Sequence, residues 1–138
     1  MKILVIDDEK NERRLYRDEL EDEGYDVVTA GTGCKGMELF KKENPDLVTL
    51  DIYMSHKSEG IELLRQMKEI RHDVPVIMLT AYDYRDDFSL WCADAYIVKS
   101  SDLNELKRTI RHWAKRAEGP GRQTATSGPG SSVSSSQA

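Results

Sequence analysis

The fold is decided by Lys2-Ile3-Leu4-Val5-Ile6-Asp7-Asp8, a short and mainly apolar run that stops abruptly at two aspartates. An uninterrupted apolar run of this length is typical of a strand buried on both faces, as in a parallel sheet covered by helices. The stretch therefore predicts the first strand of a parallel sheet, with carboxylates at the end of the strand.

The same pattern recurs along the chain, because β-like runs alternate with longer amphipathic segments. Leu15, Tyr16 and Leu20 have helical spacing, and Gly24 is suited to ending that helix because glycine accepts a left-handed conformation. Five repeats of this kind predict a doubly wound α/β domain, with a five-stranded parallel sheet and five helices on both faces. The predicted strands cover about 2–6, 26–30, 46–50, 75–79 and 95–98, and the predicted helices about 11–23, 34–43, 60–70, 85–92 and 103–115.

Composition separates the end of the chain from the rest. Residues 119–138 are almost entirely Gly, Pro, Ser, Thr, Gln and Ala, too few apolar side chains to offset the entropy of ordering the segment. We therefore expect one domain over 1–118 and a disordered Gly/Ser-rich tail or linker over 119–138.

Charge and cysteine content restrict the function classes. The net charge of −5 argues against a surface built to coat nucleic acid, so we expect no direct nucleic-acid binding. Cys34 and Cys92 have no metal-ligand spacing, and no signal peptide is evident, which indicates a cytoplasmic protein. No apolar run approaches the ~20 residues of a membrane span, and we expect no membrane contact.

Chemically active side chains stand at four predicted strand ends: Asp7 and Asp8, Asp51, Thr80, and Lys99. Ligands of open α/β sheets bind at the carboxyl ends of the strands, where these side chains would gather. Three neighbouring carboxylates repel one another unless a cation lies between them, and oxygen ligands of this kind suit Mg²⁺. A carboxylate can attack phosphorus, and an amine and a hydroxyl can stabilise the transferred oxygens.

The pattern resembles the receiver domains of two-component response regulators. The resemblance rests on four stretches and covers residues 1 to about 117: Ile6-Asp7-Asp8-Glu9, Leu50-Asp51-Ile52, Leu79-Thr80-Ala81 and Tyr96-Ile97-Val98-Lys99. It implies a CheY-like, flavodoxin-like fold with strand order 2-1-3-4-5. It also implies that Asp51 accepts a phosphoryl group from a sensor histidine kinase or a phosphotransfer protein, in a Mg²⁺-dependent reaction that Lys99 and Thr80 assist.

The resemblance further implies the ligands of the metal. Asp8, Asp51 and the backbone carbonyl of Tyr53 would bind Mg²⁺ directly, and Asp7 would act through water. Thr80 and Tyr96 would be the switch residues that change the face made by the fourth helix, the last strand and the last helix. The domain would catalyse only its own phosphorylation and dephosphorylation, and would signal through a downstream protein that the sequence does not identify. The sequence does not decide whether phosphorylation leads to a homodimer.

Two departures from the family pattern stand out. The loop at 53–60 lacks the usual proline and has one extra residue, and Ser100 follows Lys99 where proline is common. A cis bond before a non-proline residue costs about 2.5–4 kcal/mol, so we expect a trans bond there.

Plainer interpretations stay open beside these. Asp7 and Asp8 could cap a helix, and Tyr96 could be core packing. The domain could also be a receiver-like interaction module that works without phosphorylation. An aspartate-dependent phosphatase is the weakest alternative. Such enzymes have two aspartates separated by one residue after the first strand, whereas Asp7 and Asp8 are adjacent.

Overall fold

The structure is a computed structural model, and it describes residues 1–51, 57–80, 93–99 and 102–117 of the 138. Internal contacts divide the chain into two units, residues 1–101 and residues 102–138, and each unit is described by itself. The first unit contains the whole sheet and three of the described helices.

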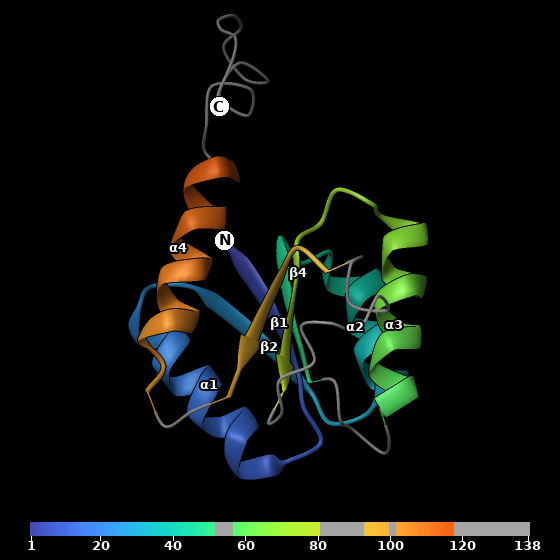
Figure 1. Cartoon of the computed structure of the whole chain (residues 1–138), viewed down its shortest axis with the longest axis horizontal. Coiled ribbons are helices and arrows are strands. Elements are labelled where there is room, and N and C mark those ends of the chain that lie inside the picture. The colour runs from blue at the N-terminus through green and yellow to red at the C-terminus, as the bar shows by residue number, and fades with distance from the viewer. Residues whose placement is uncertain (52–56, 81–92, 100–101, 118–138) are drawn as a thin grey trace, which may run out of the picture. The chain divides into compact units, whose positions relative to one another are not determined.

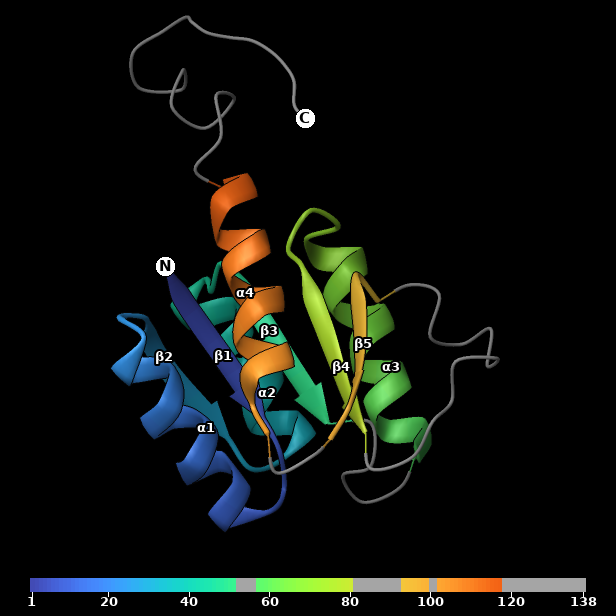
Figure 2. The same cartoon turned by 60° about the vertical axis from the view of Figure 1, so that its left-hand side comes forward.

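The predicted parallel sheet is confirmed. Its strands lie in the order β2-β1-β3-β4-β5, and every neighbouring pair is parallel (Figure 2). Because the pairing is parallel, all five carboxyl ends point to the same edge of the sheet. The bounds are β1 Lys2–Ile6, β2 Asp26–Ala30, β3 Leu47–Asp51, β4 Val76–Thr80 and β5 Ala95–Val98.

Four helices are described: α1 Lys10–Asp22, α2 Gly33–Glu43, α3 Lys57–Ile70 and, in the second unit, α4 Asn104–Ala117. The predicted start of α3 at Gly60 was wrong by about one turn, because the polar residues that precede Gly60 carry no apolar periodicity. Just before α4, Asp102 accepts from the backbone N–H of Asn104 at 2.9 Å. The helix predicted at 85–92 lies outside the described residues.

Helix α1 ends where the sequence predicted. Gly24 has φ +100°, its N–H donates to the carbonyl of Glu21 at 2.9 Å, and the N–H of Tyr25 donates to Leu20 at 3.2 Å. These two bonds form a Schellman motif, in which a left-handed glycine closes the helix and satisfies its last carbonyls.

The main core lies between the sheet and the pair α2 and α3. Phe40 of α2 and Met67 of α3 are almost fully buried there, against alternate residues of the central strands. Helix α1 covers the opposite face of the sheet, where it buries Tyr16 and Leu20 (Figures 1 and 2). The strand residues of the main core are Leu4, Ile6, Ala30, Val48, Leu50, Val76 and Met78.

The amino-terminal ends of β4 and β5 are joined by a polar network. Lys68 of α3 forms an ion pair with Asp94 at 2.6 Å and donates to the carbonyl of Val74 at 2.8 Å. Asp94 also accepts from the N–H of Val76 at 2.8 Å. One partly buried lysine and one carboxylate therefore fix three chain segments at this edge of the sheet.

Among the residues that the structure describes, no helix is long and apolar enough to cross a membrane.

We expect Gly36 and Ile6 to be energetically coupled, because a Cβ added to Gly36 would lie 2.7 Å from Cδ1 of Ile6. Gly36→Ala should cost about 1–3 kcal/mol through overpacking, partly offset by a helix propensity gain of about 1 kcal/mol. Ile6→Val removes the Cδ1 atom, so Gly36→Ala should cost less in that background. Urea unfolding of the wild type, both single variants and the double variant measures the coupling. Equal costs in the two backgrounds would contradict this packing.

Candidate functional site

Backbone pairing brings the predicted site residues to one edge of the sheet. Asp51 is the last residue of β3 and pairs with Leu79, and Asp7 directly follows β1. The ladder continues one residue past β1, since the N–H of Asp7 donates to the carbonyl of Ala30 at 3.1 Å. It also continues past β5, where the N–H of Lys99 donates to the carbonyl of Thr80 at 2.6 Å. The side chains at this edge are therefore placed by sheet hydrogen bonds and not by long loops.

Three carboxylates meet at this edge. One oxygen each of Asp7, Asp8 and Asp51 lies within 4.8 Å of the others. Asp7 and Asp51 are buried, whereas Asp8 is exposed. Buried carboxylates this close together are unfavourable without a positive charge, and an all-oxygen donor set suits a hard divalent cation.

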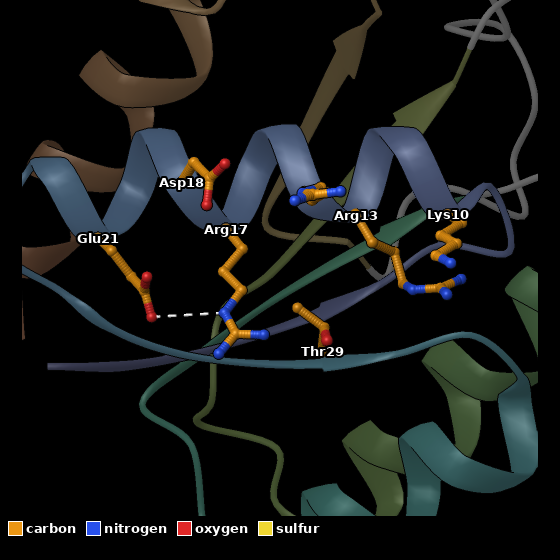
Figure 3. A pocket seen from close by; sticks show the side chains of 7 residues that line it. Lys10, Arg13, Arg17, Asp18, Glu21 and Thr29 are labelled. Atoms are coloured by element: carbon orange, nitrogen blue, oxygen red, sulfur yellow. Dashed lines mark ion pairs between the residues drawn. The ribbon is translucent and has the colours of Figure 1, made fainter.

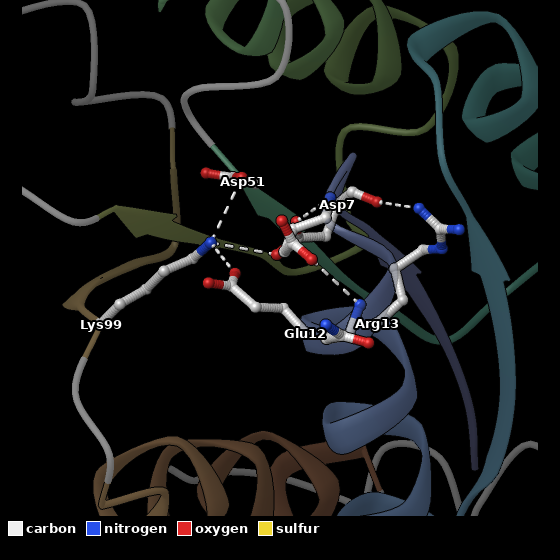
Figure 4. A network of polar contacts seen from close by, with 7 residues as sticks. Asp7, Glu12, Arg13, Asp51 and Lys99 are labelled. Atoms are coloured by element: carbon white, nitrogen blue, oxygen red, sulfur yellow. Dashed lines mark hydrogen bonds and ion pairs between the residues drawn. The ribbon is translucent and has the colours of Figure 1, made fainter.

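The Lys99 ammonium supplies the positive charge of the site. Its Nζ lies 3.0 Å from Oδ2 of Asp7 and 3.2 Å from Oδ2 of Asp51, and it also donates to Oε1 of Glu12 (Figure 4). Burial by itself would lower the pKa of Lys99, but the hydrogen bond to Glu12 and the neighbouring aspartates outweigh it and raise the pKa above its ordinary value. Lys99 is thus a fully charged group among carboxylates.

The first aspartate is held by several donors. Oδ1 of Asp7 accepts from the N–H of Glu9 at 2.8 Å, while Oδ2 faces Lys99. The guanidinium of Arg13 donates to the carbonyl of Asp7 at 2.8 Å and passes over Gly31, where a Cβ would lie 2.7 Å from the guanidinium. Both carboxylate oxygens and the carbonyl of Asp7 therefore have protein donors.

The predicted switch residues share one face of the sheet. Tyr96 pairs with Met78 on the neighbouring strand, and Thr80 follows Met78 by two residues, so Thr80 and Tyr96 project from the same face. Thr80 is fully buried, and Tyr96 packs, partly buried, against the core under α2 and α3. Core packing and a switch role for Tyr96 are compatible with this position.

Two predicted features lie outside the described residues. They are the backbone carbonyl of Tyr53, within the altered loop at 53–60, and the bond between Lys99 and Ser100.

A separate hollow of about 420 Å³ runs along α1 beside β2 (Figure 3). Its lining is both basic and acidic, and Arg17 pairs with Glu21 across one turn at 3.5 Å. Pairs of this exposed kind contribute little to stability, and such mixed charges are typical of a solvated helix face. The lining residues are Lys10, Arg13, Arg14, Arg17, Asp18, Glu21 and Thr29.

The sequence did not identify Glu12 or Arg13 as parts of the site. One signal was present, because Glu12 precedes the buried Tyr16 by four residues and therefore lies on the same side of the helix.

Comparison with known proteins places the chain among signalling domains. The sequence model of the response regulator receiver domain matches residues 3–111. The chain is 40% identical over 120 residues to a probable transcriptional regulator, ycf27, of Porphyridium aerugineum, covering 85% of the chain and 49% of the relative. It is 37% identical over 120 residues to the alkaline phosphatase synthesis transcriptional regulatory protein PhoP of Bacillus subtilis, covering 85% and 50%. The chain thus spans about half the length of these curated relatives.

Solved structures agree with the sequence comparison. The response regulator TrrA of Thermotoga maritima, crystallised with Mg²⁺ and BeF, is 42% identical with a TM-score of 0.76 and covers 81% of this chain and 97% of its own. TrrA in complex with the histidine kinase ThkA gives a TM-score of 0.75 at the same identity and coverage.

Removing the Lys99 charge should destabilise the fold. We expect Lys99→Met to lower the free energy of unfolding by about 3 kcal/mol, because Asp7 and Asp51 then face each other without compensation. Millimolar Mg²⁺ should restore part of the loss by replacing the missing positive charge. Chemical denaturation with and without Mg²⁺ measures both effects. The exposed Lys35→Met is the control and should change stability by less than about 0.5 kcal/mol. A variant as stable as the wild type would refute the compensating role.

Tyr16 should make the fold sensitive to alkali. Burial is the main cause that raises its pKa from 10.0 to about 12, while Lys99 lowers the pKa and the carboxylates raise it. The unfolded chain then loses the phenol proton first, so stability falls as pH rises from 10 to 12. Between pH 10 and 12, the free energy of unfolding of Tyr16→Phe should fall by up to about 2–3 kcal/mol less than that of the wild type. Unfolding measured at several alkaline pH values tests this, and parallel curves for the two proteins would disprove it.

Proposed function

Because this chain belongs to the response regulator receiver domain family, we propose that Asp51 is its phosphoryl acceptor. The family consists of phospho-acceptor signalling modules, not of conventional enzymes. One observation carries the choice of Asp51: its buried carboxylate lies 3.2 Å from the Lys99 ammonium and within 4.8 Å of two further carboxylates. Acceptor, counter-charge and candidate cation ligands therefore lie at one point.

The transfer step follows from these positions. An oxygen of Asp51 forms a bond to phosphorus while the bond to the donor's leaving group breaks, and the leaving group takes the electron pair. Lys99 donates hydrogen bonds to the phosphoryl oxygens, and the buried hydroxyl of Thr80 is the neutral donor on the neighbouring strand. The side chains position the group and neutralise charge, and no protein proton is consumed.

The acid cluster fits a magnesium ion. Asp8 and Asp51 would hold Mg²⁺ directly, and Asp7 would act through water, since Glu9 and Lys99 already donate to its oxygens. The backbone carbonyl of Tyr53 completes the proposed ligand set. When bound, the ion supplies positive charge to the phosphoryl oxygens.

The signal is proposed to leave through Thr80 and Tyr96. They share one sheet face on adjacent strands, so a movement of Thr80 toward the acceptor would change the space next to Tyr96. Phosphorylation would bias two arrangements of the signalling face, which the family resemblance assigns to the fourth helix, the last strand and the last helix. A downstream protein or a second receiver would bind that face in its phosphorylated arrangement.

The remaining assignments are also proposals. A sensor histidine kinase or a phosphotransfer protein is the proposed donor, supported by the similarity to TrrA, which was crystallised with a histidine kinase. We propose a cytoplasmic receiver domain over 1–118 that does not itself bind nucleic acid, supported by the family match over 3–111 and the net charge of −5. The Gly/Ser-rich segment 119–138 is proposed to be a disordered tail.

Intact-mass measurement tests the acceptor. Incubation with acetyl phosphate should add one phosphoryl group in the presence of Mg²⁺ and much less without it, and Asp51→Asn should abolish the addition. Asp73→Asn, at an exposed site, should be phosphorylated like the wild type. Equal phosphorylation of Asp51→Asn would move the acceptor elsewhere. No addition with any donor would favour the interaction module that works without phosphorylation.

A further inference from the structure

Glu12 is a site residue that the proposed function leaves without a role. It lies in the first turn of α1, and its carboxylate accepts a hydrogen bond from Nζ of Lys99. In Figure 4 its side chain reaches the amine from the helix, while Asp51 reaches it from strand β3. Glu12 is not one of the three carboxylates that could share a metal ion. Its contact with Lys99 therefore needs its own explanation.

Three carboxylates share the donors of Lys99. An ammonium group has three N–H donors, and here three carboxylates lie within ion-pair distance of Nζ, those of Asp7, Asp51 and Glu12. A phosphoryl group on Asp51 adds new anionic oxygens on the side of β3. Lys99 can donate fully to those oxygens only if one of its present acceptors gives up its share.

Glu12 is the acceptor that can leave at least cost. The side chain of Asp7 is 1% exposed and is also fixed by the N–H of Glu9, so it has nowhere to go. The side chain of Glu12 is 39% exposed, and rotation toward solvent would return its carboxylate to water. A carboxylate that regains hydration loses little when an ion pair opens, whereas a buried carboxylate left unpaired loses much.

We propose that Glu12 is a positioning residue that holds Lys99 toward α1 and competes with the phosphoryl group on Asp51 for the ammonium. This inference rests on the proposed function of Asp51. During transfer the oxygen–phosphorus bond at Asp51 forms, the bond to the leaving group breaks with its electron pair, and Lys99 exchanges one hydrogen bond from Glu12 to a phosphoryl oxygen. No proton is transferred in this exchange. Glu12 thereby sets how readily the domain becomes phosphorylated.

The competition predicts that loss of the Glu12 charge strengthens the interactions of phosphoryl-like anions but weakens the binding of Mg²⁺. Glu12→Gln keeps the side-chain length but removes the charge, so at saturating Mg²⁺ phosphorylation by acetyl phosphate should be about two- to fivefold faster, the range expected for a partly exposed ion pair. Beryllofluoride, an anion that imitates the phosphoryl group, should bind more tightly by a similar factor. Mg²⁺ alone should bind more weakly, because the edge has lost one negative charge. A purely structural role would weaken all three.

Two comparisons separate the contact with Lys99 from a general charge effect. Glu9→Gln removes the same charge from a neighbouring side chain that accepts from the N–H of Asn11, and it should change the phosphorylation rate by less than about twofold. In the Lys99→Met background, Glu12→Gln should no longer accelerate phosphorylation. Nitrogen NMR of the lysine ammonium groups provides a readout without any phosphoryl donor, since only Glu12→Gln should shift the Lys99 signal strongly.

The experiment is the phosphorylation rate of the wild type, Glu12→Gln, Glu9→Gln and their Lys99→Met counterparts, with urea unfolding to verify that each variant is folded. Faster phosphorylation in Glu12→Gln alone, lost with Lys99→Met, supports the competition. An unchanged or slower rate, or the same acceleration in Glu9→Gln, overturns it. A wild type that is not phosphorylated at all refutes the role of Asp51, while the NMR shift still reports whether Glu12 holds Lys99.

Discussion

The ion pairs of the Lys99 ammonium are the interaction on which the carboxyl edge of the sheet depends. Parallel pairing delivers Asp7 and Asp51 to neighbouring strand ends, and neither can move away because the backbone ladder fixes both. Two buried carboxylates held this way repel each other strongly in a medium that screens poorly. The ammonium of Lys99, whose side chain is 14% exposed, turns that repulsion into a stable cluster. Burial opposes its charge, yet the surrounding acids prevail, so the cluster stays ionic.

Much of the fold and of the acid site followed from short patterns. Uninterrupted apolar runs identified the strands, because a strand covered on both faces has no polar side to display. The meeting of Asp7, Asp8 and Asp51 was predictable, since parallel strands end at a common edge and each residue follows or closes a run. The start of α3 was less accessible, because its first turn from Lys57 is polar and lacks periodicity. The strand order required the family resemblance, as periodicity does not say which strands are neighbours.

The part of the site contributed by α1 could not be predicted for a geometric reason. A helical pattern identifies the buried stripe but not which polar residue at its border leans over the edge of the sheet. Glu12 and Arg13 stand at that border, where Glu12 contacts Lys99 and Arg13 contacts the carbonyl of Asp7. The strand pattern was equally uninformative about the side chain of Thr49. Its hydroxyl is buried within β3 and has no hydrogen-bond partner among the described residues, which nothing in the strand pattern foretold.

The two edges of the sheet are held by different interactions, and only those at the carboxyl edge respond to a ligand in the proposed function. At the amino edge, Lys68 and Asp94 tie α3, β4 and β5 together through groups that no ligand in the proposed function touches. At the carboxyl edge, cohesion depends on a balance of charges that a cation or a covalent phosphate alters. The amino ends of β4 and β5 are thus held independently of any ligand, whereas the carboxyl ends are not. A chemical event of a few atoms at the carboxyl edge would therefore act on side-chain charges there, while the pairing of the strands and the amino edge keep the register unchanged.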